Sequence, residues 1–184
     1  MRIIGGSCRG HSLKTPSGQD IRPTSDKVRL AVFNALFSRS AVAEAKVLDA
    51  FCGTGALGLE ALSQGADECL FLDASRTSLA LAKENANQLG LIDQAQFRFG
   101  DSQKLGKRDD AIEPRTLVFL DPPYRKDLVP QTVSALMAGN WCAEEAILVV
   151  ETEKEADLSK LEEAASIIFD KTYGETRVTF WRLT

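Results

Sequence analysis

The sequence predicts an α/β fold in which a mostly parallel sheet carries helices on both faces. The apolar runs "KVL", "CLFL", "LVFL" and "AILVV" do not alternate with polar residues, which is typical of strands buried on both faces. Segments with helical spacing separate these runs, as expected for βαβ units. A glycine-rich loop, "DAFCGTGALG", follows the first run, where open α/β sheets hold a nucleotide.

The N-terminal part of the chain is predicted to be a hairpin or loop arm at residues 1–22. In it, "RIIGG" has the pattern of a short strand and "TPSGQD" has turn chemistry. A helix is expected from about residue 25 to residue 37. Thr24 or Ser25 can cap its N-terminus, and apolar residues recur along it at helical spacing.

Strands and helices alternate over the rest of the chain. Strands are predicted at residues 46–51, 68–74, 95–101, 115–124 and 145–153. Helices are predicted between them at 56–65, 75–90 and 128–139. The last two apolar runs, 166–174 and 176–183, are predicted to form a hairpin around Gly174 at the sheet edge.

Length and composition indicate one domain of 184 residues with a small appendage. We divide it into a basic arm at 1–22 and a single domain at 23–184. The charged fraction of 26% and the hydrophobic fraction of 44% indicate a soluble globular protein. No apolar run approaches the roughly 20 residues that span a bilayer, and the N-terminus has no signal-peptide pattern. We therefore expect a cytoplasmic monomer with no membrane contact.

The four cysteines, Cys8, Cys52, Cys69 and Cys142, do not form a metal-binding or redox motif. No two of them make a C-x-x-C pair, and His11 is the only histidine. We therefore expect buried, reduced thiols, no metal site and no cysteine-based catalysis.

Charge is distributed unevenly along the chain. Residues 1–29 contain six Lys or Arg and two acidic residues, a net +4, so the remainder carries −8 of the chain's total of −4. Such a basic segment on an acidic body suits either a nucleic-acid contact or a solvated leader.

Four predicted strands carry an aspartate at the end of their apolar or strand-like run, namely Asp49, Asp73, Asp101 and Asp121. In a parallel sheet these ends meet at one edge, where open α/β folds bind ligands. Each aspartate alone could equally be a helix cap or a turn former. Four at one edge predict a ligand site.

The loop after the first strand contains G-x-G-x-x-G at Gly53, Gly55 and Gly58. Glycines allow close approach of a ligand to the backbone and to the N–H groups of the next helix. Asp73 follows Gly53 by 20 residues and can accept hydrogen bonds from ribose hydroxyls, while Asp101 can reach an adenine amine. NAD and S-adenosylmethionine both carry an adenosine ribose, so this loop does not choose between them.

The stretch "FLDPPY" distinguishes between NAD and S-adenosylmethionine as the ligand. Its prolines stiffen the turn and hold the preceding residues extended. Asp121 and the carbonyl of Pro122 can accept hydrogen bonds from an exocyclic NH2 of a nucleobase, and Tyr124 offers a face for stacking. Accepting both N–H groups favours a pyramidal nitrogen whose lone pair can attack a methyl-sulfonium carbon. The motif therefore predicts amine methylation.

At this point the chain resembles class I S-adenosylmethionine-dependent methyltransferases with an (Asp/Asn)-Pro-Pro-Tyr motif. The stretches "MRIIGGSCRGHSL", "RPTSDKVRLAVFNAL", "VLDAFCGTGALGLEALSQGA" and "YGETRVTFWRL" are similar to the bacterial 16S rRNA guanine-N2 methyltransferase family RsmD. The resemblance implies a Rossmann-like seven-stranded sheet with a C-terminal antiparallel hairpin. It also implies methyl transfer from S-adenosylmethionine to N2 of one guanine in 16S rRNA, within assembling or assembled small subunits.

The resemblance also assigns residues to roles. The implied cofactor-binding residues are Asp49, Phe51, Gly53, Gly55, Asp73, Ala74, Asp101 and Ser102. The implied catalytic residues, which hold the guanine, are Asp121, Pro122 and Tyr124. The implied RNA contacts are Arg2, Arg9, His11, Lys14, Arg22, Lys27 and Arg29. His11 departs from the Arg or Lys expected at its position, which weakens that contact at neutral pH.

Three other functions stay open at this stage. A DNA adenine-N6 methyltransferase shares the Asp-Pro-Pro-Tyr motif, but 184 residues leave no visible target-recognition domain. An NAD-dependent oxidoreductase matches the glycine loop and gives "DPPY" no role. A non-catalytic RNA-binding module would use only the basic arm.

Overall fold

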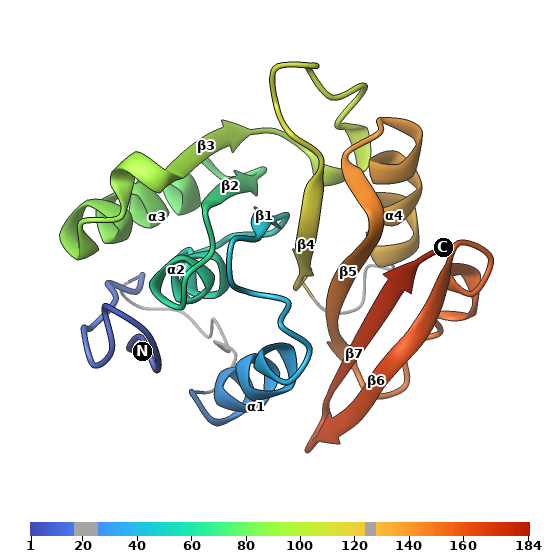
Figure 1. The fold of residues 1–184 in the computed structure, drawn as a ribbon, viewed down its shortest axis with the longest axis horizontal. Coiled ribbons are helices and arrows are strands. Elements are labelled where there is room, and N and C mark those ends of the chain that lie inside the picture. Colours follow the sequence, from blue (N-terminus) through green and yellow to red (C-terminus); the bar gives the residue numbers. More distant parts are fainter. Residues whose placement is uncertain (17–25, 124–127) are drawn as a thin grey trace.

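The computed structural model describes residues 1–16, 26–123 and 128–184. Within them, seven strands form one sheet in the order β3-β2-β1-β4-β5-β7-β6 (Figure 1). The strands are β1 (Lys46–Asp49), β2 (Glu68–Asp73), β3 (Ala95–Phe99), β4 (Arg115–Leu120), β5 (Cys142–Glu153), β6 (Ala165–Tyr173) and β7 (Thr176–Leu183). The α-helices are α1 (Asp26–Phe37), α2 (Ala56–Ser63), α3 (Arg76–Leu89) and α4 (Leu128–Ala138). Short 3₁₀ turns are η1 (Ile92–Gln94), η2 (Ser102–Lys104) and η3 (Ser159–Leu161).

The pairing of the strands confirms the predicted topology. Strands β1 to β5 pair in parallel, whereas β7 pairs antiparallel with both β5 and β6. The chain runs outward from β1 through β2 to β3 and then returns to the other side of β1 as β4. The order reverses between β1 and β4, and ligands of open α/β sheets bind beyond the strand ends at such a reversal.

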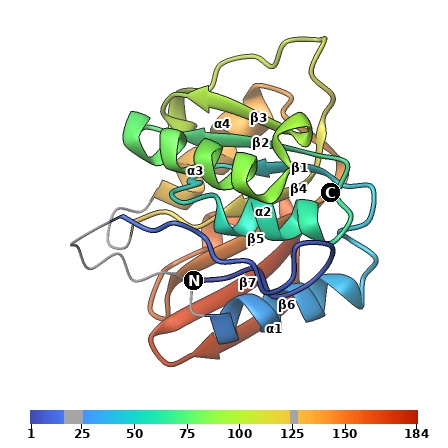
Figure 2. The same ribbon diagram turned by 90° about the vertical axis from the view of Figure 1, so that its left-hand side faces the viewer.

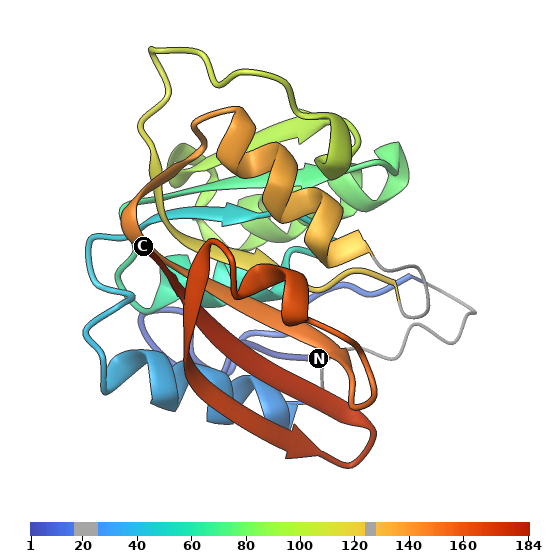
Figure 3. The same cartoon turned by 90° about the vertical axis from the view of Figure 1, so that its right-hand side faces the viewer.

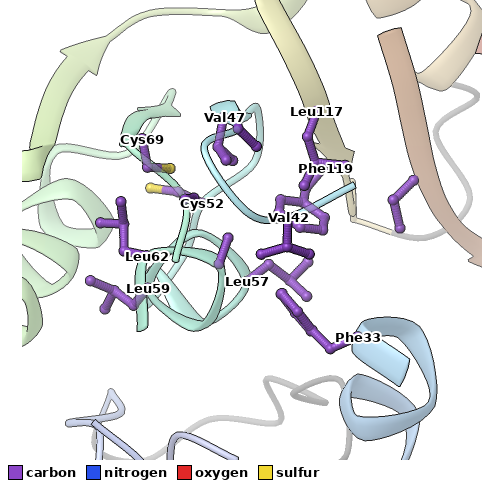
Figure 4. Packing of buried hydrophobic residues seen from close by; sticks show 14 of the residues in the cluster. Phe33, Val42, Val47, Cys52, Leu57, Leu59, Leu62, Cys69, Leu117 and Phe119 are labelled. Atoms are coloured by element: carbon purple, nitrogen blue, oxygen red, sulfur yellow. The ribbon is translucent and has the colours of Figure 1, made fainter. Parts of the chain in front are cut away.

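Two hydrophobic clusters lie on opposite faces of the sheet. One joins α1, α2 and α3 to the sheet, and Figure 4 shows Phe33 of α1 and Leu57 of α2 in it together with Phe119 of β4. The ring centroids of Phe33 and Phe119 are 5.8 Å apart. The other cluster lies under α4, which crosses the strands in Figure 3. Both faces of the central strands are therefore covered, which explains their continuous apolar runs.

The N-terminal segment, residues 1–16 as described, lies against the domain beside α2 and α3 (Figure 2). Only one antiparallel bridge forms in it, between Arg2 and Ser12, so the predicted strand is reduced to a single pair. Three apolar residues of this segment are buried in the cluster that joins α1, α2 and α3 to the sheet. They are Ile3, Cys8 and Leu13. The predicted boundary after residue 22 lies outside the described residues and stays a prediction.

Other sequence predictions concern the thiols and the membrane. All four cysteines are free, and Cys8, Cys52 and Cys69 are buried. Burial raises the pKa of the Cys52 thiol well above its ordinary value, which keeps it protonated. In the described part of the chain, no helix is long and apolar enough to cross a membrane, and no cluster of potential metal ligands was found.

Gly58 lies inside α2, where the helix meets β2. A Cβ at this position would lie 2.4 Å from Cε1 of Phe71 and 2.6 Å from Sγ of Cys69, and both side chains are fully buried. The third glycine of G-x-G-x-x-G is therefore a packing residue.

Gly58→Ala is accordingly expected to lower the free energy of unfolding by about 1–3 kcal/mol through overpacking. Urea denaturation of the two proteins measures the difference. Gly100→Ala is the matched control, because the nearest atom to its Cβ, Cδ1 of Leu72, is 3.7 Å away. Equal losses in both variants would contradict the packing role.

Candidate functional site

The parallel sheet brings the predicted strand-end aspartates to one edge. Asp49 is the last residue of β1 and Asp73 the last of β2. Asp121 directly follows β4, and Asp101 lies two residues beyond β3. Their side chains nevertheless have different environments, which assigns them different tasks.

The glycine loop between β1 and α2 leaves open space beside Gly53. Gly53 has a φ of +52°, and a Cβ there would have no neighbour within 4 Å. Gly55 has a φ of +81° and is the N-cap residue of α2, where a Cβ would lie 3.1 Å from that of Ala82. The first glycine therefore offers its backbone to a ligand, and the second allows α2 to start close to α3.

Asp73 holds this loop in place. One carboxylate oxygen accepts a hydrogen bond from the N–H of Gly53 at 2.9 Å, and the other accepts from the N–H of Ser75 at 2.8 Å. The side chain is only partly buried. Each carboxylate oxygen can accept a further hydrogen bond. Asp73 can therefore hold the glycine loop and bind a ligand hydroxyl at the same time.

Asp49 supports the loop from the interior. It is 1% exposed, and its carboxylate accepts a hydrogen bond from the N–H of Gly58 at 3.0 Å. Burial raises the pKa of Asp49 to about 7. The negative charge of Asp73 also raises this pKa, whereas the hydrogen bond from Gly58 lowers it. Asp49 therefore acts through the loop in this structure, and its direct contact with a ligand stays a prediction.

The raised pKa of Asp49 makes stability depend on pH. The folded chain binds more protons at this group than the unfolded chain between pH 3.8 and about 7. Protonated Asp49 therefore contributes on the order of 4 kcal/mol to the free energy of unfolding at pH values below 3.8. This contribution is lost as the pH rises through about 7. We expect urea midpoints of the ligand-free protein to fall between about pH 4.5 and pH 7.5. Asp49→Asn keeps an acceptor for Gly58 and should flatten this change, so an unchanged pH dependence in the variant would contradict the assignment.

The other predicted cofactor residues surround this loop on the ends of β1, β2 and β3. Asp101 caps η2 by accepting from the N–H of Gln103 at 3.0 Å and remains partly exposed. Ser102 is 3% exposed and faces α4, with its hydroxyl 3.4 Å from that of Thr132. Phe51 is half-buried and Ala74 exposed. Their contact with a cofactor stays a prediction.

The stretch after β4 begins with Asp121, which is partly buried, and Pro122, which is buried. Tyr124 lies outside the described residues. Asp121 precedes a proline, so its backbone is restricted to extended conformations and continues the direction of β4. The first two residues of the motif are therefore at the carboxyl edge, beside the sheet reversal.

The predicted RNA-contacting residues divide into two groups. Arg2, Arg9, His11, Lys14 and Lys27 are exposed. Lys14 forms an ion pair with Glu84 at 2.5 Å and Arg2 one with Asp26 at 3.7 Å, which reduces their free charge. Arg22 lies outside the described residues.

The predicted RNA contact of Arg29 is wrong, because its side chain is fully buried. Its Nη2 donates to Asp26 at 2.9 Å and to the carbonyl of Arg2, and its Nε lies 3.5 Å from a carboxylate oxygen of Glu60. Glu60 also accepts from the N–H groups of Ile4 at 2.9 Å and Gly5 at 2.8 Å. Arg29 and Glu60 therefore join α1, α2 and the N-terminal segment.

Two buried polar residues near this edge were missed by the sequence prediction. Asn85, fully buried on α3, donates to the carbonyl of Thr54 at 2.9 Å and exchanges two hydrogen bonds with the backbone of Lys14. It thus ties the basic segment to the glycine loop, and nothing in the local sequence indicates this. Glu151, in β5, is 7% exposed. It follows the run "AILVV", the same signal that marked the four aspartates.

Comparison with known proteins gives consistent matches over nearly the whole chain. The family model described as "Conserved hypothetical protein 95" matches residues 1–182. The chain is 34% identical to the "Ribosomal RNA small subunit methyltransferase D" of Escherichia coli strain K12, over 95% of this chain and 86% of that protein. It is equally identical to the protein of that name from Haemophilus influenzae, over 95% and 89%. The solved structure of "Putative methyltransferase yhhF from Escherichia coli" superposes with a TM-score of 0.85 at 33% identity, covering 100% of this chain and 97% of that one.

Proposed function

Because this chain belongs to the conserved hypothetical protein 95 family, the RsmD family of ribosomal RNA small subunit methyltransferases, we propose that it methylates N2 of a guanine in 16S rRNA. The proposed methyl donor is S-adenosylmethionine, and the proposed substrate is the assembling or assembled small subunit. The observation that carries the proposal is the position of Asp121 and Pro122 at the carboxyl edge, where the sheet order reverses beside the glycine loop.

The residues at this edge fit an adenosine-bearing cofactor. The open space beside Gly53 admits a ligand to the backbone, and Asp73 has acceptor capacity beyond its two hydrogen bonds. We assign Phe51, Gly53 and Gly55 to the methionine part, Asp73 and Ala74 to the ribose, and Asp101 and Ser102 to the adenine. When bound, S-adenosylmethionine supplies a methyl group whose transfer leaves the bonding electron pair on sulfur.

The amine of guanine is a poor nucleophile, since its lone pair is delocalised into the ring. Asp121 and the Pro122 carbonyl accept hydrogen bonds from its two N–H groups in our proposal, which favours a pyramidal nitrogen whose lone pair is localised and available for attack. Asp121 then takes the proton that N2 loses. The methyl donor carries its own leaving group, so most of the catalysis comes from holding the amine in line.

The exposed basic residues of the N-terminal segment and α1 are proposed to bind RNA phosphates. These are Arg2, Arg9, Lys14 and Lys27, together with His11. The rest of the chain is acidic, so binding should weaken steeply as salt rises. Through Asn85 this segment is also linked to the glycine loop.

The test is transfer of a labelled methyl group to small subunits from cells that lack this protein. We expect one labelled nucleoside in 16S rRNA, identified as N2-methylguanosine by digestion and mass spectrometry. No transfer in any assembly state would overturn the proposal. A label recovered as N6-methyladenosine would show that the enzyme methylates N6 of adenine instead of N2 of guanine.

A further inference from the structure

We propose that Glu151 of β5 is the residue that selects guanine, by accepting a hydrogen bond from its N1–H beside the amine held by Asp121. The inference rests on the proposed function and names its base-specificity residue. It follows from the strand register, from the side of the sheet on which the two carboxylates lie, and from the hydrogen-bonding pattern of guanine.

The register places Glu151 next to Asp121. Strands β4 and β5 are parallel, and Leu120 is paired with Val150. The next residues of the two strands are Asp121 and Glu151. Neighbouring strands are about 4.8 Å apart, so the two side chains start from adjacent backbone positions.

The alternation of side chains puts both carboxylates on the same face. Phe119 and Val149 belong to the cluster that faces α1 and α2, whereas Leu120 and Val150 belong to the cluster under α4. Asp121 and Glu151 therefore continue the face of Phe119 and Val149. Asp121 keeps this alternation beyond the end of β4, because the following proline holds it extended.

The hydrogen-bonding pattern of guanine requires an acceptor at this position. N1–H and the N2 amine are neighbouring donors on the same edge of the base. With Asp121 and the Pro122 carbonyl on the amine, N1–H would be buried without a partner, which is costly. Glu151 is 7% exposed and lies beside Asp121, so its carboxylate is placed to accept N1–H.

The same carboxylate discriminates against a base whose N1 carries no proton. The N1 of adenine or of 2,6-diaminopurine presents a lone pair, which a carboxylate repels. A site built to accept a hydrogen bond rejects an analogue that lacks the donor strongly, because its own polar group is left unsatisfied. The 2,6-diaminopurine base retains an amine at C2 and thus tests N1 alone.

The experiment uses small subunits reconstituted with 16S rRNA that carries either guanine or 2,6-diaminopurine at the target position. We expect the wild-type protein to methylate the C2 amine of guanine at least about 100-fold faster than that of 2,6-diaminopurine. Glu151→Gln should slow the guanine reaction by about 10–100-fold. It should also reduce the ratio of the guanine rate to the 2,6-diaminopurine rate at least tenfold, because the glutamine amide can donate a hydrogen bond to an unprotonated N1.

Glu153→Gln is the matched control, since it removes the same charge two residues along the same strand face. It should leave the preference unchanged. If Glu151→Gln slows the methylation of guanine and of 2,6-diaminopurine equally, Glu151 has only a structural role and the inference is overturned. If Glu151→Gln does not fold, Glu151→Asp replaces it and should slow the reaction while keeping the preference for guanine; a lost preference would count against the inference. Failure of the wild-type protein to methylate guanine N2 would overturn the proposed function and this inference with it.

Discussion

Asp121→Ala is expected to lower the methylation rate of small subunits at saturating S-adenosylmethionine by at least about 10³-fold. The change removes an acceptor that orients the amine and takes its proton. Asp121 follows β4, whereas the glycine loop is held by Asp73 and Asp49 from other strands. The affinity for S-adenosylhomocysteine, measured by calorimetry, should therefore stay within about 3-fold of wild type, well under 1.4 kcal/mol.

Asp121→Asn is the matched control for this prediction. The amide has the same shape and one acceptor oxygen, but it cannot take a proton at neutral pH. It should retain more activity than Asp121→Ala and less than the wild-type protein. A collapse of cofactor affinity in Asp121→Ala with surviving turnover at saturating cofactor would show that the role assigned to Asp121 is wrong.

Asp73→Ala is expected to weaken S-adenosylhomocysteine binding by about 10–100-fold, corresponding to the loss of a hydrogen bond to a charged group. The change removes the proposed ribose acceptor and frees the N–H groups of Gly53 and Ser75. The Michaelis constant for S-adenosylmethionine should rise accordingly, while turnover at saturation falls less. Calorimetry and initial rates over a range of cofactor concentrations separate the two effects.

Ser75→Ala is the control for local damage to this turn. It removes the cap of α3, in which the Ser75 hydroxyl accepts from the N–H of Ser78 at 3.2 Å, and the hydrogen bond between the Ser75 and Thr77 hydroxyls at 2.8 Å. The cost should be about 1 kcal/mol of stability, with little change in cofactor affinity. If Ser75→Ala weakens binding as much as Asp73→Ala, the carboxylate has no specific role.

Most of the fold follows from local patterns in the sequence. The buried strands were predicted from continuous apolar runs, and the helices from the spacing of their apolar residues. In the structure, Ser75 caps the start of α3 and Gly90 follows its end. The hairpin around Gly174 was also predicted correctly, with β6 at the sheet edge. The predicted first strand shortens to one bridge between Arg2 and Ser12, and the N–H groups of Ile4 and Lys14 donate to Glu60 and Asn85 instead of extending the pairing. Those partners lie more than 50 residues away.

The candidate site was predicted in part. The glycine loop and Asp73 are adjacent in space as expected, since a strand-end residue and the loop of the neighbouring strand meet at the same edge. Arg29 was misassigned, because a charged residue on a short helix gives no local sign of burial and its carboxylate partner Glu60 lies on another helix. The task of Asp49 also depends on burial, which raises its pKa to about 7.

The sequence by itself determined the order of strands and helices, the glycine loop and the acids at the strand ends, because each of these depends on neighbours within a few residues. Only the tertiary structure decided which charged residues are buried and which carboxylates lie side by side. The pairing of β4 with β5 sets Leu120 beside Val150, so that Asp121 and Glu151 are the next residues of two neighbouring strands. Strand register and burial depend on contacts between distant segments, and a local pattern of residue types does not specify them.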